Sequence, residues 1–336
     1  MLRWATSVVG AFLLLVVAAA PASPGRDSGQ ALRLGGTPLQ LLAGRGSLWL
    51  LTCDRGCRGG ARHSIGRIIR IDPRNARAVG WARIPRPSTV AIGAGGLYAT
   101  DFERGMIRRV DLRTLQFVGA LKLKLPFRFS ASDNAFLPEA VAVGRNAVWV
   151  VSDRGAIVRA DLRLHRAVAS LRIPPDAFGD PVGGVAADTG GVWSAESLAG
   201  VYRVDQRANR ISAKIRVPLP TGQFDAVQVF PLAGHVLALG VKTSGGALTQ
   251  RNLLARIDAD NNRVQGTTSL PSGQLVATTG AGSLWVARLG GSTVERIEPR
   301  TGRVVGRFRA RAGAALAVAG GHLWTVSTRG VVRQLR

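Results

Sequence analysis

A short phrase recurs seven times along this 336-residue chain and constrains its fold more than any other feature. Each copy has a small or polar turn residue, an apolar residue, an aromatic residue or Leu, and then small and apolar residues. The copies are GSLWLL (46–51), GGLYAT (95–100), NAVWVV (146–151), GGVWSA (190–195), GHVLAL (234–239), GSLWVA (282–287) and GHLWTV (321–326). Repeats of about 40–50 residues built from short alternating strands are typical of β-propeller blades. The sequence therefore predicts an all-β, seven-bladed β-propeller.

The segment 274–310 shows the four-stranded pattern of a single blade. It reads as an inner strand LVATT, a second strand SLWVA, a third strand TVERIE and an outer strand RVVGRFR, separated by turn residues. The same order is found in 89–123, 140–173 and 184–217. Blades one and five are longer, and their extra residues, 52–64 and 240–251, are expected to form Gly-rich loops between second and third strands.

The last blade is short of one strand. Residues 315–336 supply three strands before the chain ends, while ALRLGG (31–36) has the pattern of an outer strand without a blade of its own. Edge strands need hydrogen-bonding partners. We therefore expect residues 31–36 to pair beside 329–335 and close the ring as four antiparallel strands.

The first residues have the pattern of an export signal. Arg3 precedes an apolar run from Ala5 to Ala20, and Ala20-Pro21-Ala22 is a small-x-small cleavage site. The run is shorter than the roughly 20 residues that span a bilayer, although an uncleaved anchor is the alternative. The expected organisation is a signal peptide at 1–22, a linker at 23–30 and a single propeller at 31–336, in an extracytoplasmic protein.

Cys53 and Cys57 are the only two cysteines. In an oxidising compartment such a close pair predicts a small disulfide loop. A metal site that includes His63 is the alternative, but no fourth ligand follows with a recognisable spacing.

The chain is strongly basic, with 45 Lys and Arg against 20 Asp and Glu and a net charge of +25. Such a charge attracts polyanions, namely an anionic membrane, an anionic cell-wall polymer or nucleic acid. Export favours the first two partners. The basic residues are dispersed without an interleaved aromatic stripe, which argues against nucleic acid.

Each of the first six third strands ends in an Arg and an acid two residues apart: Arg70/Asp72, Arg109/Asp111, Arg159/Asp161, Arg203/Asp205, Arg256/Asp258 and Arg296/Glu298. We expect the acid to begin a turn by accepting backbone N–H groups, and the Arg to pack along a neighbouring strand. Five of the turns then place an Arg two residues after the acid: Arg74, Arg113, Arg163, Arg207 and Arg300. These five are candidates for docking onto an anionic surface, and an ordinary solvated face is the alternative.

Carboxylates gather in the loops expected at the other end of the propeller. The candidates for a ligand or metal face are Asp101, Glu139, Asp153, Glu196 and Asp225. Clustered carboxylates can hold Ca²⁺ or Mg²⁺ or attract a cationic ligand. Alternatively, they cap turns and pair with arginines.

The stretch V-x-R-(I/V)-D, five residues and V-V-G, followed by a Pro and G-x-x-L-W-V, resembles secreted bacterial propellers of the YncE type. It also resembles the streptogramin lyase-like and NHL-like propellers, over about 30–336. This resemblance implies ligand binding at the loop end of the central channel. Lyase-like members work there with Mg²⁺ and a catalytic His, but His165, His235 and His322 are expected at the opposite end. A lactonase-like hydrolase needs carboxylates and an Asn around one divalent ion, and Asn134 near Glu139 fits that pattern.

No nucleophile constellation, phosphate-cradling loop or metal triad is present in the sequence. We therefore interpret the chain as a secreted, non-catalytic propeller with a basic face suited to anionic surfaces. Its loop face would bind an unidentified protein or small molecule. A divalent-metal-dependent lyase or lactonase-like hydrolase acting at the channel mouth is the alternative.

Overall fold

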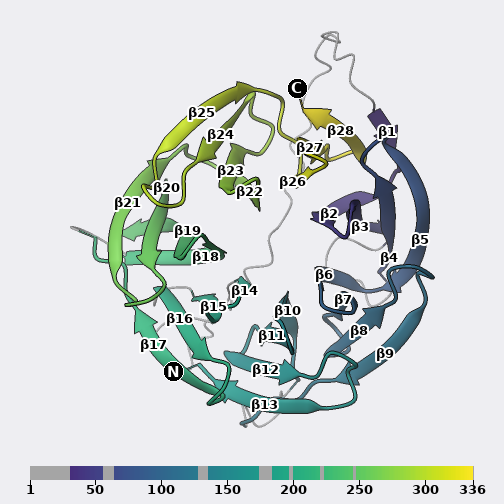
Figure 1. Ribbon diagram of the computed structural model, residues 1–336, viewed down its shortest axis with the longest axis horizontal. Coiled ribbons are helices and arrows are strands. Elements are labelled where there is room, and N and C mark those ends of the chain that lie inside the picture. The colour runs from purple at the N-terminus through teal and green to yellow at the C-terminus, as the bar shows by residue number, and fades with distance from the viewer. Residues whose placement is uncertain are drawn as a thin grey trace, which may run out of the picture.

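The strands form a closed ring of seven antiparallel sheets, each with four strands (Figure 1). The structure is a computed structural model and describes residues 31–55, 64–127, 135–173, 184–196, 200–219, 223–244 and 247–335. All regular elements among these residues are strands. The predicted seven-bladed β-propeller is confirmed.

In the first six blades the strands follow chain order from the channel to the outer rim (Figure 1). Blade one contains β2 (Thr37–Gly44), β3 (Ser47–Arg55), β4 (Ile65–Asp72) and β5 (Arg77–Pro85). Blade two contains β6 (Pro87–Gly93), β7 (Gly96–Asp101), β8 (Met106–Val110) and β9 (Phe117–Lys122). Blade three contains β10 (Pro138–Val143), β11 (Val148–Ser152), β12 (Ala156–Ala160) and β13 (Ala167–Arg172).

The next three blades repeat this order. Blade four contains β14 (Val185–Ala187), β15 (Val192–Glu196), β16 (Gly200–Asp205) and β17 (Arg210–Ile215). Blade five contains β18 (Gln223–Leu232), β19 (His235–Ser244), β20 (Ala247–Asp258) and β21 (Val264–Leu270). Blade six contains β22 (Leu275–Gly280), β23 (Ser283–Arg288), β24 (Thr293–Ile297) and β25 (Val304–Arg309).

Blade seven is built from both ends of the chain, as predicted (Figure 1). It contains β26 (Ala315–Ala319), β27 (His322–Val326), β28 (Val331–Leu335) and, as its outer strand, β1 (Ala31–Arg33). The closing strand is shorter than expected. The Leu34 amide still donates to the Gly330 carbonyl at 3.1 Å, but Gly35 and Gly36 then adopt φ values of +68° and +74°. This left-handed backbone turns the chain away from β28 and into blade one.

The prediction of loops at 52–64 in blade one and 240–251 in blade five is partly wrong. β3 continues to Arg55, and in blade five pairing continues between β19 and β20 as far as Ser244 and Ala247. The physical reason is the alternation of β-branched and polar residues, which persists through Val241 and Thr243 and favours an extended strand. Residues 56–63 lie outside the described part of the chain.

The repeated aromatic residue anchors the seams between blades. Trp49, Tyr98, Trp149, Trp193 and Trp324 are at most 1% exposed. One hydrophobic cluster joins Trp149 of blade three to residues of blade four, and another joins Trp324 of blade seven to residues of blade one. Burial of a large ring by five of the seven anchors explains why the phrase recurs; blade five has the buried Leu237 at this position and Trp285 of blade six is partly buried.

Among the residues that the structure describes, no helix is long and apolar enough to cross a membrane. The predicted signal peptide at 1–22 and linker at 23–30 lie outside these residues, so both remain predictions.

Candidate functional site

Antiparallel strand order gives the propeller two distinct ends. We call one end the turn face, formed by the first-to-second and third-to-outer connections. We call the other end the loop face, formed by the second-to-third connections and the links between blades. The third-to-outer turns are 72–77, 111–116, 161–166, 205–210, 258–263 and 298–303.

Acids begin the turns of the turn face, as the sequence predicts. Asp111 Oδ1 accepts the backbone N–H of Arg113 at 2.9 Å and that of Thr114 at 2.8 Å. The same bond to the amide two residues later measures 2.9 Å at Asp72, 2.9 Å at Asp161, 2.8 Å at Asp205 and 2.9 Å at Asp258. These bonds stabilise the carboxylate form and fix the turn backbone.

The pKa values of these aspartates are lowered, for related reasons. Backbone N–H donors lower the pKa of Asp111, Asp205 and Asp258, led by Thr114, Ala208 and Asn261 respectively. The Arg74 side chain is the main cause at Asp72. Burial opposes the shift at Asp161, but the amides of Arg166, His165 and Arg163 outweigh it. Each of these five aspartates is therefore ionised at neutral pH.

The five predicted docking arginines, Arg74, Arg113, Arg163, Arg207 and Arg300, are all exposed. Arg74 is bound to Asp72, with Nε at 3.1 Å from Oδ1 and Nη2 at 3.0 Å from Oδ2, while its side chain remains 88% exposed. The structure thus brings the five to equivalent positions around one end of the ring. A second set of turn arginines is also exposed, namely Arg77, Arg166, Arg210, Arg263 and Arg303.

The third-strand arginines have a different environment, because in the first six blades each lies directly across from the anchor residue of its blade, which is aromatic in all of them except blade five, where it is Leu237. The guanidinium carbon lies over the indole ring at 5.7 Å for Arg70 on Trp49, 5.5 Å for Arg159 on Trp149, 5.0 Å for Arg203 on Trp193 and 5.7 Å for Arg296 on Trp285. Cation–π contacts of this kind stabilise the sheet. Sequence reasoning missed this pairing, although an offset of 10 or 11 residues between the anchor and the Arg in blades two, three, four and six carries the signal.

Several of these arginines also reach the next blade. Arg159 Nη1 donates to the Gln206 carbonyl at 2.7 Å, and Arg203 Nη1 donates to Asn262 Oδ1 at 3.0 Å. Arg159 and Arg203 therefore link neighbouring blades by hydrogen bonds. Blade seven departs from the pattern, because Trp324 faces Gln334.

On the loop face, described acids pair with arginines. Asp101 is fully buried, with Oδ2 at 3.7 Å from Arg108 Nη2, so it does not lie on the accessible surface where the sequence places it. Asp153 Oδ2 lies 3.3 Å from Arg154 Nε. Glu103, another loop acid, lies 2.6 Å from Arg86. These pairs match the alternative in which the loop carboxylates are neutralised by arginines.

The other loop-face candidates lie on the strands β10, β15 and β18. Glu139 is the second residue of β10 and is partly buried. Glu196 ends β15 and Asp225 lies near the start of β18, at the loop-face ends of these strands, while their side chains lie outside the description. Among the described residues, no three His, Cys, Asp or Glu side chains converge on a possible metal site.

The histidines lie where the repeat pattern expects them. His235 and His322 begin β19 and β27, and His165 lies in the turn 161–166, so all three are at the turn face. His63 and Asn134 lie outside the described residues, as does Cys57, the predicted partner of the buried Cys53. The Cys53–Cys57 disulfide therefore remains a prediction.

Comparisons with known proteins support the architecture. No family model matches the chain, and no curated protein matches its sequence. Among solved structures, BamB from Moraxella catarrhalis is similar at 14% identity and a TM-score of 0.57, covering 90% of this chain and 86% of that one. The Kuenenia stuttgartiensis hydrazine synthase is similar at 11% identity and a TM-score of 0.65, covering 93% and 99%. At these identities the likeness shows the propeller fold alone, and membership of the YncE-like, streptogramin lyase-like or NHL-like groups is not confirmed.

Proposed function

We propose that this protein is an exported, non-catalytic propeller that docks onto an anionic surface through its turn face. The observation that carries the proposal is the exposure of all five docking arginines at equivalent positions of five blades. Repeat symmetry places such residues at similar heights along the propeller axis, so they can meet a flat surface together. Several weak contacts made at once give a much higher avidity than one contact.

The charges of the turns support this orientation. In the turns 72–77, 161–166, 205–210 and 298–303, two arginines accompany one acid. Asp72, Asp161 and Asp205 accept backbone N–H groups, and Glu298 accepts the Thr301 hydroxyl, so each acid holds its turn in one shape. Positive charge therefore exceeds negative charge at these four corners of the ring, and polyanions would be attracted to them.

The proposal includes export and a second binding function. Residues 1–22 would direct secretion, and the Cys53–Cys57 disulfide would form outside the cytoplasm. The loop face would bind a protein or a small molecule. Because Asp101 and Asp153 are paired with arginines, a Ca²⁺- or Mg²⁺-dependent lyase or hydrolase is the weaker alternative for this end.

Binding to vesicles tests the docking function. The protein should bind vesicles that contain phosphatidylglycerol and leave vesicles of pure phosphatidylcholine unbound. Its affinity should fall steeply as salt is raised, because each arginine contact releases counterions and is screened within about 10 Å at 0.1 M salt. Equal binding to both vesicle types, or affinity that does not change with salt, would refute the proposal.

A further inference from the structure

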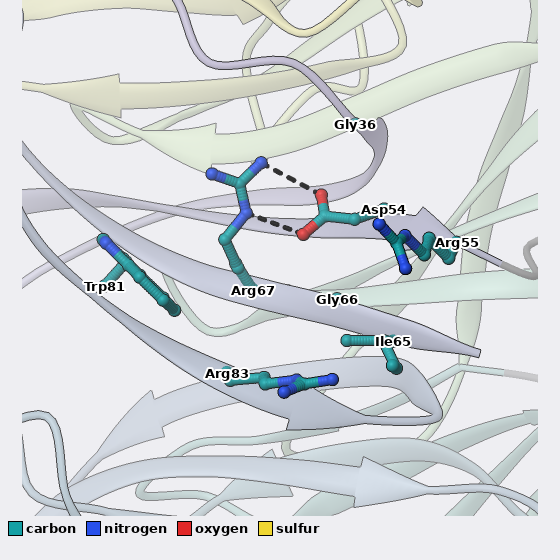
Figure 2. A pocket seen from close by; sticks show the side chains of 8 residues that line it. All are labelled: Gly36, Asp54, Arg55, Ile65, Gly66, Arg67, Trp81 and Arg83. Carbon is teal, nitrogen blue, oxygen red and sulfur yellow. Dashed lines mark hydrogen bonds and ion pairs between the residues drawn. The ribbon is translucent and has the colours of Figure 1, made fainter. Parts of the chain in front are cut away.

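Two residues that set blade one apart from the other blades, Arg67 and Trp81, lie together at its outer flank. A pocket of about 400 Å³ lies there, between blade one and the segment that follows the closing strand (Figure 2). Asp54, Arg67, Trp81 and Arg83 line it, together with Arg55 and small or apolar residues. Trp81 lies at one end of this pocket and Arg55 at the other, with the joined Arg67 and Asp54 side chains between them (Figure 2).

The short closing strand explains why this pocket is open. β5 has nine residues, while its neighbour across the seam, β1, has three. The described residues therefore leave part of the blade-one flank uncovered, and Trp81 is 59% exposed. Four other described tryptophans are almost fully buried, and the fifth, Trp285, is partly buried.

Comparison between blades separates the pocket residues from the repeat. The residues at the position of Trp81 in blades two to six are Ala120, Ser170, Lys214, Thr267 and Arg307. Those at the position of Arg67 are Met106, Ala156, Gly200, Leu253 and Thr293. An aromatic ring and a strand arginine at these positions are thus particular to blade one. Residues shared by all blades serve the fold, whereas residues of one blade are candidates for function.

The Arg67–Asp54 pair is held rigidly. Arg67 Nε donates to Asp54 Oδ2 at 2.6 Å, and Nη2 donates to Oδ1 at 3.0 Å and to the Leu34 carbonyl at 3.1 Å. Thr52 Oγ1 adds a bond to Asp54 Oδ1 at 3.1 Å. The Asp54 hydrogen bond raises the pKa of Arg67. Gly36 permits this approach, because a Cβ there would come too close to Asp54 Oδ1.

The remaining groups define the ligand. Arg67 Nη1, on the side of the guanidinium that faces away from Asp54, and the second lone pair of Asp54 Oδ2 have no partner among the described residues, and they offer a donor and an acceptor to ligand hydroxyl groups. Trp81 offers an exposed flat ring. Arg55 and Arg83 are exposed, and neither side chain bonds to a described residue, so both are available to an anion.

We infer that this pocket binds a negatively charged sugar residue, such as a uronic acid unit of an acidic polysaccharide. The sugar ring stacks on Trp81, its hydroxyls bond to Arg67 and Asp54, and its carboxylate lies near Arg55 and Arg83. This site is separate from the turn face, so the failure of one proposal leaves the other standing.

Titration with trigalacturonic acid tests the inference, using the mature protein and its own fluorescence. Binding should be saturable and should protect Trp81 from an aqueous quencher. Trp81→Ala, which copies Ala120 of blade two, should weaken binding about tenfold or more, because tryptophans often dominate binding sites. Arg83→Ser, which copies Ser269 of blade five, should also weaken binding. The control Arg309→Ser changes the equivalent position in blade six and should bind as the parent protein does.

Three results would overturn the inference. The first is that no saturable binding is found at ligand concentrations up to about 10 mM, because a larger dissociation constant would mean that binding is too weak to be specific. The second is unchanged binding by Trp81→Ala. The third is a failure of selectivity. Either neutral maltotriose binds as tightly as trigalacturonic acid, or inorganic phosphate at equal concentration displaces the trigalacturonic acid completely. Melting temperatures of the variants close to that of the parent protein would confirm that each remains folded.

Discussion

The two ends of the propeller use the same residue types in opposite ways. At the turn face, acids such as Asp111 and Asp205 bind backbone amides, and arginines such as Arg113 and Arg207 extend into solvent. At the loop face, Asp153 lies against the Arg154 side chain, and Asp101 lies against Arg108 while its Oδ1 also accepts the Arg104 backbone N–H at 3.2 Å. The nearby arginines therefore differ in exposure: those of the turns reach solvent, even Arg74, which is bound to Asp72, whereas Arg108 and Arg154 are mostly buried beside their acids.

This difference shows that net charge alone does not locate a docking surface. Exposed arginines such as Arg104, Arg288 and Arg329 are present at the loop face too. The turn face differs because its arginines lie in short turns whose backbone the first acid of the turn holds in place, as Asp111 and Asp205 do. We therefore attribute docking to arrangement rather than to the number of charges.

Deleting residues 31–36 should have the largest effect, because both faces depend on a closed ring. The deletion removes the outer strand of blade seven and uncovers the core against which Leu32 and Leu34 pack. We expect a loss of several kcal/mol, a large part of a typical folding stability, together with aggregation at the exposed strand edge. Deleting residues 23–30 is the matched control and should leave the melting temperature unchanged. Equal melting of the two truncated proteins would contradict closure by β1.

The second prediction separates strand arginines from turn arginines within one blade. Arg203→Gln removes the contact with Trp193 and the bond to Asn262 across the seam, and should cost about 1–2 kcal/mol. Arg207→Gln, four residues later and exposed, should stay within about 0.5 kcal/mol. Urea denaturation measures both changes. If the two variants lose similar stability, the claim that strand arginines stabilise the fold and turn arginines do not is wrong.

The cysteine pair should matter little to global stability. Mass spectrometry of exported protein without reductant should show Cys53 linked to Cys57. Replacing both by Ser should change the melting temperature by only a few degrees, because closing so short a loop removes little entropy from the unfolded chain. Two free thiols in exported protein would contradict the expected oxidising compartment.

Acid should weaken the turn face slightly and in a defined direction. The pKa of Asp205 is lower in the folded state, so its contribution is complete above the unfolded value, about 3.9, and disappears as pH falls through the folded value. Asp205→Asn should be slightly less stable than the parent protein at pH 7, and the difference should shrink as the pH falls below about 3.9, in thermal melts across this range. A constant difference at every pH would show that the carboxylate charge does not stabilise the turn.

The fold was largely predictable because the same sequence pattern recurs in each blade. The recurring anchor, exemplified by Trp149, and the unpaired pattern at 31–36 indicated seven blades and the way in which they close. The site was less predictable, because it depends on which groups meet across seams. The sequence does not show that Arg159 bonds to the neighbouring turn, or that Asp101 is buried beside Arg108. Only the strand register sets Trp81 apart from the equivalent residues of the other blades.

Two five-fold variants test the central claim most directly. One changes the turn-face arginines Arg74, Arg113, Arg163, Arg207 and Arg300 to Gln, and the other changes the exposed loop-face arginines Arg104, Arg216, Arg288, Arg311 and Arg329 to Gln. Both lose the same charge. Binding to phosphatidylglycerol vesicles at about 0.1 M salt, where charges are screened beyond about 10 Å, should fall about tenfold or more for the turn-face variant and far less for the loop-face variant. Equal losses would show that net charge, and not the arrangement of the turn face, governs docking.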